Sequence, residues 1–368
     1  MRLAFVNSTH KWGGVKTWCI DMGRSALEDG HSVLVYGQDP RFVKKAGQAG
    51  LSAYQVHFGP DFNPLLIARF VRDFKLHGIT HVIVNVGKDL RSAGIAARLL
   101  GIPLMVRVGN PVDFTNTLLR QLINGLLGPV YLCCSDFCRT GIIRSNPWLV
   151  NRRVEAIHPG TPIPDTLPPA HKIRTIIATS QLLLVKRHED LIHACAILHD
   201  DGLPFRLNIV GTGDQEQKLK ALTLSLGLQD VISFRGHVAD VAAELRQADI
   251  FVLPTECEAL GIALEEALAQ GLYPIARNAG GVPEIWPEAL RDNLLPPESG
   301  PEQFAAALRK ALLLPDAEMA RCHAMIQEHA RACFAQGRQY GLFKEYLLSL
   351  APEHPSGRQA SPSTPCVL

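Results

Sequence analysis

Short apolar runs and longer stretches with the period of an amphipathic helix alternate along the chain in two series. The apolar runs of the first series are residues 3–6, 32–36, 53–58, 81–86, 104–108 and 130–133. Those of the second series are residues 175–179, 206–210, 231–234, 250–253 and 272–276. Strands that alternate with helices in this way predict a parallel sheet covered by helices. We therefore expect an α/β protein with two doubly wound, Rossmann-like domains whose ligands bind in the cleft between them.

A proline-rich stretch separates the two series. Residues 159–169 hold five prolines, which favour a linker over a helix or a central strand. We expect a first domain at residues 1–165 and a second at residues 170–350, because a chain of 368 residues suits two domains. The closing helical segment, residues 316–350, is a candidate to pack back on the first domain. Residues 351–368, rich in Pro and Ser, are expected to form a disordered tail, and we assign it no function.

The composition is that of a soluble globular protein. Hydrophobic residues make up 47% of the chain and charged residues 20%, which excludes disordered, collagen-like and coiled-coil proteins. No apolar run approaches the roughly 18 residues of a spanning helix, and the first residues lack a signal-peptide pattern, so we expect a cytoplasmic protein. Nine scattered cysteines favour reduced thiols. Cys133 and Cys134 follow an apolar run and are expected to be buried packing residues rather than metal ligands.

Charge is distributed unevenly between the two halves. Residues 1–170 carry 19 Lys and Arg against 11 Asp and Glu, whereas residues 171–368 carry 18 against 24. A basic first half suggests contact with an anionic partner, such as a phospholipid surface or a phosphorylated acceptor. Ordinary scatter of charge over two solvated surfaces is an equally good interpretation. We expect no nucleic-acid partner.

A glycine pair follows the first predicted strand. Gly13 and Gly14 lead into a helix whose apolar positions include Val15, Trp18 and Met22. Paired glycines at a helix N-terminus let backbone N–H groups close on an anion, so a phosphate site is one interpretation. A tight turn without a ligand is as frequent, and the spacing is not the G-x-G-x-x-G of dinucleotide enzymes.

A pair of carboxylates follows the strand at residues 250–253. Glu258 falls in the loop after the strand and Glu266 in the helix that runs from about Gly261 to Gly271. A carboxylate in a largely buried helix needs donors, and a vicinal diol of a sugar or ribose offers two. We expect Glu265 to be the surface residue of this helix. A second glycine pair, Gly280 and Gly281, follows the next strand, and two such loops are able to clamp a diphosphate.

Several spaced motifs resemble glycosyltransferase family 4, the glycosyl transferases group 1, which have the GT-B fold. They are Ile-Val-Gly-Thr-Gly at 209–213, Phe-Arg-Gly-His-Val at 234–238, Gly-Gly-Val-Pro-Glu at 280–284, and the two glutamates with seven residues between them. The resemblance covers most of the chain, but the first half matches chiefly through its opening strand, its glycine pair and the alternation of strands and helices. It implies an enzyme that uses a nucleotide-sugar donor, and lipopolysaccharide or other cell-surface glycan synthesis as the setting.

The resemblance also implies roles for matching residues. Glu258 would face the donor sugar, Glu266 would hold the nucleotide ribose, and Lys186 would face the donor phosphates. The remaining donor-binding positions are Gly13, Gly14, Leu260, Gly261, Gly280 and Gly281, with Val238 near the base. Because a departing nucleoside diphosphate gains charge in the transition state, Lys186 is the strongest catalytic candidate, with Glu258 beside it.

The chain departs from the family pattern at three places. Gln181 stands where relatives carry a phosphate-binding Arg, and nearby Arg187 is a candidate to replace it. Ala259 and Leu260 stand where relatives carry Gly and Phe. The first-domain His of many relatives is not evident, and residues 107–113 take its place. Arg107, Asn110 and Asp113 there, together with His10, are candidates for acceptor or sugar contact. A plain strand-end turn at Asn110 is the slightly favoured alternative.

These features lead us to expect a GT-B glycosyltransferase that acts on a glycan or glycolipid acceptor, with peripheral contact between its basic first domain and the inner membrane. We expect no cofactor and no metal, because no Asp-x-Asp and no metal-ligand spacing occurs. Similar enzymes retain anomeric configuration. The alternatives are a sugar-phosphate synthase or an epimerase of the same fold, and a weakly catalytic partner subunit that binds a nucleotide sugar. An oxidoreductase is disfavoured, because no G-x-G-x-x-G follows a strand.

Overall fold

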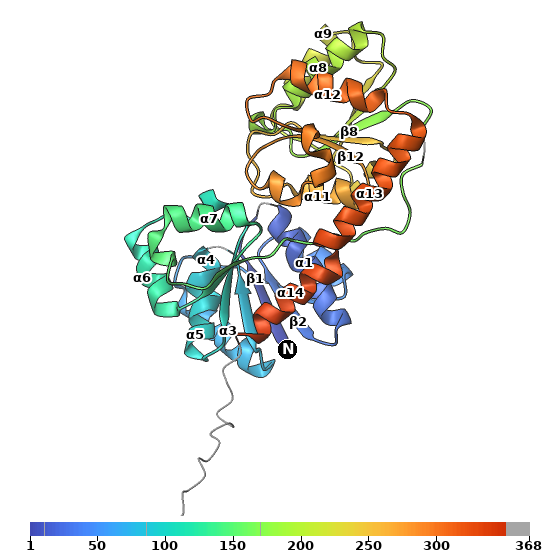
Figure 1. The fold of residues 1–368 in the computed structure, drawn as a ribbon. Helices are drawn as coiled ribbons and strands as arrows, with labels where there is room; N and C mark the ends of the chain where they lie inside the picture. The colour runs from blue at the N-terminus through green and yellow to red at the C-terminus, as the bar shows by residue number, and fades with distance from the viewer. Residues whose placement is uncertain (11, 86, 170, 351–368) are drawn as a thin grey trace, which may run out of the picture.

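The computed structural model describes residues 1–10, 12–85, 87–169 and 171–350. It consists of two α/β domains, each a parallel sheet covered by helices (Figure 1). The predicted fold class is therefore confirmed. Three sequence-based expectations fall on other parts of the chain: Val86 at the end of a predicted strand, residue 170 at the start of the second domain, and the tail at 351–368 lie outside the described residues.

The first domain has a seven-stranded parallel sheet in the order β3-β2-β1-β4-β5-β6-β7. Its strands are β1 (Arg2–Asn7), β2 (Ser32–Gly37), β3 (Ser52–Gln55), β4 (His81–Val84), β5 (Leu104–Val108), β6 (Val130–Cys133) and β7 (Val154–Ala156). Its helices are α1 (Gly14–Glu28), α2 (Pro40–Gln48), α3 (Pro64–Leu76), α4 (Gly87–Asp89), α5 (Ile95–Leu99), α6 (Leu118–Leu127) and α7 (Asp136–Ser145). Central strands such as β4 and β5 are buried along their whole length, as strands covered on both faces must be.

The second domain has a six-stranded parallel sheet in the order β10-β9-β8-β11-β12-β13. Its strands are β8 (Thr175–Thr179), β9 (Arg206–Val210), β10 (Ile232–Gly236), β11 (Ile250–Leu253), β12 (Tyr273–Arg277) and β13 (Leu294–Leu295). Its helices are α8 (His188–Asp200), α9 (Glu216–Ser225), α10 (Val241–Leu245), α11 (Ile262–Ala269), α12 (Pro301–Leu312), α13 (Asp316–Phe334) and α14 (Gln336–Leu348).

Short edge strands account for most differences from the sequence-based elements. The strands β7 and β13 have three and two residues, too few to leave an apolar pattern, and the sequence analysis missed both. The predicted strand at 53–58 pairs only as far as Gln55. Val56 and Phe58 are nevertheless buried, each 1% exposed, because they pack into the core beyond the end of the strand, where Val56 N still donates to Gly37 O of β2 at 2.9 Å. The apolar pattern at these positions therefore reflects burial in the core and not an extension of the strand.

The predicted closing helix is two helices rather than one. It breaks at Ala335, whose ψ of 138° is that of extended backbone. Thr161 of the linker enters the break, where its N–H donates to Phe334 O and its carbonyl accepts from Gln336 N, at 3.1 and 2.9 Å. The linker thus satisfies the helix-end groups that the break leaves free.

The helix α14 returns to the first domain and packs beside α1 (Figure 1). The ring of Phe343 lies 5.3 Å from that of Trp18 and 6.5 Å from that of Phe5. Tyr340 donates to Asp29 at 2.9 Å. The chain therefore crosses between the domains twice, once through the linker and once between α13 and α14.

The order of each sheet reverses at one point, between β1 and β4 in the first domain and between β8 and β11 in the second. Ligands of such sheets bind where the order reverses, outside the carboxyl ends of the strands. No helix among the described residues is long and apolar enough to cross a membrane.

Candidate active site

A cleft of about 1480 Å³ lies between the two domains. Its wall in the first domain comes from the segments after β1, β4 and β5, and its wall in the second from the segments after β8, β10 and β11. These segments include both places where a sheet order reverses. The cleft is therefore at the position that the fold predicts for a ligand.

Two helix N-termini, one from each domain, face each other in the cleft. Gly13 and Gly14 begin α1, Gly261 and Ile262 begin α11, and all four line the cleft. Gly14 approaches α11 so closely that a Cβ there would overlap the side chain of Ile262. Neither helix has a side-chain cap, and α1 has no acidic residue in its first turn. The first N–H groups of both helices thus point toward the cleft with the positive ends of their dipoles.

Lys186 and Glu258 form an ion pair on the cleft wall. Each side chain is largely buried, at 18% and 17% exposed. The loops that carry them are joined by backbone, since Glu256 N donates to Val185 O at 3.0 Å. A cation and a carboxylate are therefore fixed side by side in the cleft that the two helix N-termini face.

Glu266 lies on the cleft wall in the second turn of α11. Burial, together with the negative charge of Asp21, raises its pKa to about 7. Among the described residues no group donates a hydrogen bond to its carboxylate. A desolvated carboxylate without donors is costly, and a ligand that brings hydroxyl groups would relieve that cost.

The expectation that Glu265 is the surface residue of this helix was wrong. Glu265 is only 1% exposed, and its Oε1 accepts from Gly160 N of the linker at 3.2 Å. Burial raises its pKa to about 8, and the neighbouring Glu266 adds to the shift. The linker covers the side of α11 that would otherwise face solvent, which a pattern within one helix does not reveal.

Gly280 and Gly281 do not line the cleft. Gly280 has φ +59°, and a Cβ there would overlap the carbonyl oxygen of Glu258, whereas a Cβ on Gly281 would overlap that of Ala259. Gly281 N donates to Glu258 O at 3.2 Å. The structure therefore places this glycine pair behind the loop that carries Glu258, where it supports the loop rather than touching a ligand.

The two domains are joined beside the cleft by polar contacts. The carboxylate of Glu284 accepts from the N–H groups of Asp136 and Phe137 at 2.7 and 2.6 Å, at the N-terminus of α7. Burial opposes ionisation of Glu284, but hydrogen bonds from His158 and these N–H groups outweigh it and lower its pKa. Ser135, the N-cap of α7, donates its hydroxyl to the carbonyl of Ala259.

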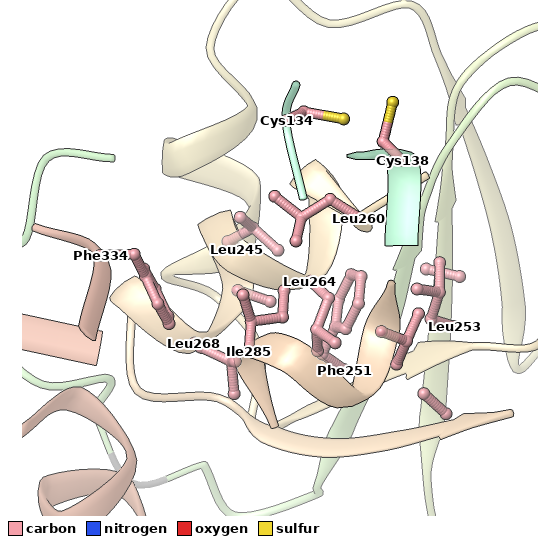
Figure 2. Close-up of a cluster of buried hydrophobic side chains, with 14 of the residues drawn as sticks. Cys134, Cys138, Leu245, Phe251, Leu253, Leu260, Leu264, Leu268, Ile285 and Phe334 are labelled. Carbon is pink, nitrogen blue, oxygen red and sulfur yellow. The ribbon is translucent and has the colours of Figure 1, made fainter. Parts of the chain in front are cut away.

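Leu260 extends the core of the second domain toward the first. It is 2% exposed and belongs to a buried cluster that includes Leu264 of α11 and Cys134 and Cys138 of the first domain (Figure 2). All three cysteines of this region, Cys133, Cys134 and Cys138, are buried free thiols. The Leu that departs from the family pattern therefore serves the contact between domains.

The candidate acceptor residues fall into two groups. Arg107, Asn110 and Asp113 line the cleft. Arg107 is 2% exposed, donates to the carbonyls of Val108 and Leu132, and stacks on Trp18 at 4.6 Å, which is a packing role. Asn110 accepts from Val112 N at 3.2 Å, the strand-end turn that the sequence analysis favoured.

His10 and Arg187 do not line the cleft. His10 is exposed and contacts Gln38. The guanidinium of Arg187 pairs with Asp190 at 2.9 Å and with Glu256 at 3.3 Å. The prediction that Arg187 replaces the missing phosphate-binding Arg was therefore wrong, because local carboxylates hold its side chain away from the cleft.

Sequence reasoning missed the cations of the first-domain wall. These cleft-lining residues are Arg41, Lys44, Lys45, Arg91 and Arg120. Arg120 is held over the ring of Phe114, 4.9 Å from its centre, and donates to Thr115 O at 2.8 Å. The charge excess of the first half was the available signal, but it does not say which of 19 basic residues gather on one wall. Among the described residues no cluster of His, Cys, Asp and Glu is arranged to hold a metal ion.

Comparisons with known proteins agree with the fold and with the family that the motifs resemble. Residues 163–331 match the family model of the glycosyl transferases group 1. A relative described as a colanic acid biosynthesis glycosyltransferase, WcaL of Salmonella typhimurium, is 33% identical over 141 residues. The match covers 36% of this chain and 34% of that protein, so it spans only about a third of the relative's length.

Solved structures resemble the whole chain. A glycosyltransferase from Rickettsia africae has a TM-score of 0.81 at 17% identity, over 96% of this chain and 100% of that one. Anabaena HepE, in complex with UDP-glucose, has a TM-score of 0.77 at 21% identity, over 95% and 100%. At these identities the likeness establishes the fold. The chain therefore has the GT-B fold, and its likeness to the glycosyl transferases group 1 family covers residues 163–331, most of the second domain.

Proposed function

We propose that the protein is a glycosyltransferase that moves a sugar from a nucleoside-diphosphate sugar to an acceptor hydroxyl in the interdomain cleft. The observation that carries the proposal is the meeting of two uncapped helix N-termini, at Gly14 and Gly261, beside Lys186. Such a place attracts a polyanion that reaches both domains, and a diphosphate has the size and charge to do so.

The remaining donor contacts follow from this placement. Glu266 accepts no hydrogen bond from the described residues and would take the two ribose hydroxyls as its donors. Val238 lies on the same wall, where the base would rest. Glu258, held by Lys186, would face the sugar next to the diphosphate. The complex of HepE with UDP-glucose, in a protein of the same fold, supports a donor of this class.

The proposed chemistry needs charge stabilisation more than it needs a base. The acceptor oxygen bonds to the anomeric carbon while the bond from that carbon to the diphosphate oxygen breaks, and the hydroxyl proton passes to the departing phosphate. Lys186 and the helix N–H groups would stabilise the charge that develops there. We propose that the transfer retains anomeric configuration and that no metal ion takes part.

We propose a glycan or glycolipid acceptor used in cell-surface polysaccharide synthesis. The wall opposite the donor site carries Arg41, Lys44, Lys45 and Arg120, which suit an acceptor with phosphate or carboxylate groups. The relative from Salmonella typhimurium is described as a colanic acid biosynthesis enzyme, which supports this setting.

A second candidate is a partner subunit that binds the donor without turning it over. The observation that favours it is Gln181, which lines the cleft in place of a cation, while Arg187 is held by Asp190. Lys186 is then the cation of residues 180–187 that lines the cleft. A single cation would stabilise the charge of the transition state less than the two cations that relatives carry here.

Release of nucleoside diphosphate from a panel of UDP-, GDP- and ADP-sugars, with membrane glycolipid extract as acceptor, tests the proposal. We expect one donor to turn over, and Lys186→Ala to lower turnover by about 10²–10³-fold. Lys310→Ala, at an exposed lysine of α12, is the matched control and should leave turnover unchanged. Donor binding without turnover in the wild type would instead favour the partner-subunit function.

A further inference from the structure

The helix α6 has an apolar face that the fold leaves uncovered. Ile123 and Asn124 point into the domain, at 9% and 0% exposed. Four leucines lie on the opposite side: Leu118, Leu119, Leu122 and Leu126 are 78%, 60%, 64% and 73% exposed. At about 100° per residue these four fall within roughly 100° of arc, so they form one continuous strip. We call these four residues the leucine face.

Single exposed leucines are ordinary on a soluble protein, but a contiguous strip is not. The end of α5 lies beside α6, where Arg98 donates to Leu126 O at 3.2 Å and the next residue, Leu99, is 67% exposed. Helix propensity does not require leucine at all four sites, because Lys, Gln or Glu would serve as well there. The leucine face therefore indicates an interaction surface.

The charge around α6 indicates what kind of partner fits. Residues 90–154, which contain α6, hold eight arginines against two aspartates and no Lys or Glu. This one segment accounts for six of the eight excess positive charges of residues 1–170. Arg98, Arg144 and Arg152 are exposed. An apolar strip within this arginine-rich segment, with Arg98 at its end and no acid between Asp113 and Asp136, suits a surface that is apolar inside and anionic at its boundary.

The other side of α6 reaches the cleft. Arg120, Ile123 and Asn124 line the first-domain wall, so one ten-residue helix separates the cleft from the leucine face. In Figure 1 α6 lies at the outer edge of the first domain, on the opposite side from α14. A partner on the leucine face would therefore leave the cleft accessible and would lie close to its acceptor wall.

We propose that the leucine face docks α6 in the plane of a lipid bilayer that contains anionic lipids. A helix of ten residues is about 15 Å long, half of what a bilayer core requires, so it lies in the interface and does not span. Docking would bring the acceptor wall to the membrane surface, and that consequence rests on the proposed function. The docking itself does not, because it needs only the leucine face and the arginines.

Vesicle sedimentation of the full chain, without donor or acceptor, tests the docking. The probes are vesicles of phosphatidylcholine alone and of phosphatidylcholine mixed with phosphatidylglycerol. We expect binding to the mixed vesicles, weaker binding to the neutral ones, and weakening as salt rises. Replacing Leu118, Leu122 and Leu126 together by Ser should lower the partition coefficient at least about tenfold, which is about 1.4 kcal/mol.

The matched control replaces three scattered exposed leucines, Leu76, Leu224 and Leu313, by Ser and should bind vesicles like the wild type. A cooperative thermal transition of both variants, followed by circular dichroism without any nucleotide, shows that each is folded and keeps this test separate from that of the proposed function. Equal vesicle binding by the two variants would overturn the proposal. So would a wild-type dimer, seen by light scattering, that the α6 substitutions alone dissociate, because a second copy would then cover the leucine face.

Discussion

Replacing Glu284 by Gln should loosen the contact between the two domains. The carboxylate accepts two N–H groups of α7, from Asp136 at 2.7 Å and Phe137 at 2.6 Å. A Gln side chain keeps one accepting oxygen and turns its NH₂ group toward the second N–H, so one hydrogen bond and the charge are lost. Hydrogen bonds to a charged group contribute about 1.5–3 kcal/mol, and we expect about 2 kcal/mol here because Glu284 is partly exposed.

This loss should appear as domain opening, because the contact joins residues of different domains. About 2 kcal/mol lowers the ratio of closed to open molecules roughly 30-fold. Small-angle scattering should show a larger radius of gyration, and the donor KM should rise because fewer molecules present a complete diphosphate site. The pKa of Glu284 is lowered, so its contribution is present above the ordinary value of 4.5 and is lost as pH falls through the lowered pKa.

The control is Glu288→Gln, at an exposed neighbour that pairs with Arg291 within its own helical turn. The wild type and the control should scatter alike. If Glu284→Gln matches them in both radius of gyration and donor KM, the contact at α7 does not hold the domains together.

Three further results are expected. Glu265→Gln should flatten the pH dependence of the melting temperature. The pKa of Glu265 is raised from 4.5 to about 8, so the wild type loses stability as pH rises from the lower to the upper value, on the order of 4 kcal/mol in total. An unchanged slope in the variant would contradict this. Gly280→Ala should lower the free energy of unfolding, measured by urea titration, by at least about 1–2 kcal/mol, because φ of Gly280 is +59° and the added Cβ overlaps Glu258 O. Gly13→Ala is the control: φ of Gly13 is −172° and the space beside it is open, so the free energy of unfolding should change by less than about 0.5 kcal/mol. Turnover of the preferred donor should persist in excess EDTA, and its loss with recovery on added Mg²⁺ or Mn²⁺ would refute the metal-independent chemistry.

The fold was predictable because its signal is local. Each strand of the two series is an apolar run between helical stretches, and parallel pairing follows from that order. The break at Ala335 was not predictable, because it depends on Thr161, which is far away in sequence and inserts between Phe334 and Gln336. The apolar residues follow a helical period both before and after Ala335, so the sequence gives no sign of the break.

The candidate site was predictable in position more than in detail. Lys186, Glu258 and Glu266 line one cleft because each follows the carboxyl end of a strand or begins the next helix. Glu265 and Gly280 were misplaced for a shared reason: their surroundings come from the linker and from another loop. A pattern within one element does not report which of its faces a distant segment covers.

Binding of nucleoside diphosphates is the most direct test of the claim that the cleft is a donor site. Melting temperatures of the wild type, Glu266→Ala and Lys186→Ala should be measured with UDP, GDP, ADP and CDP in the absence of metal. Glu302→Ala, at an exposed glutamate of α12, serves as the control. One nucleotide should stabilise the wild type and the control, by about 2.7 kcal/mol at 100 times its Kd, and both cleft variants should lose most of this effect. Stabilisation that survives in both cleft variants, or none by any nucleotide, would contradict it.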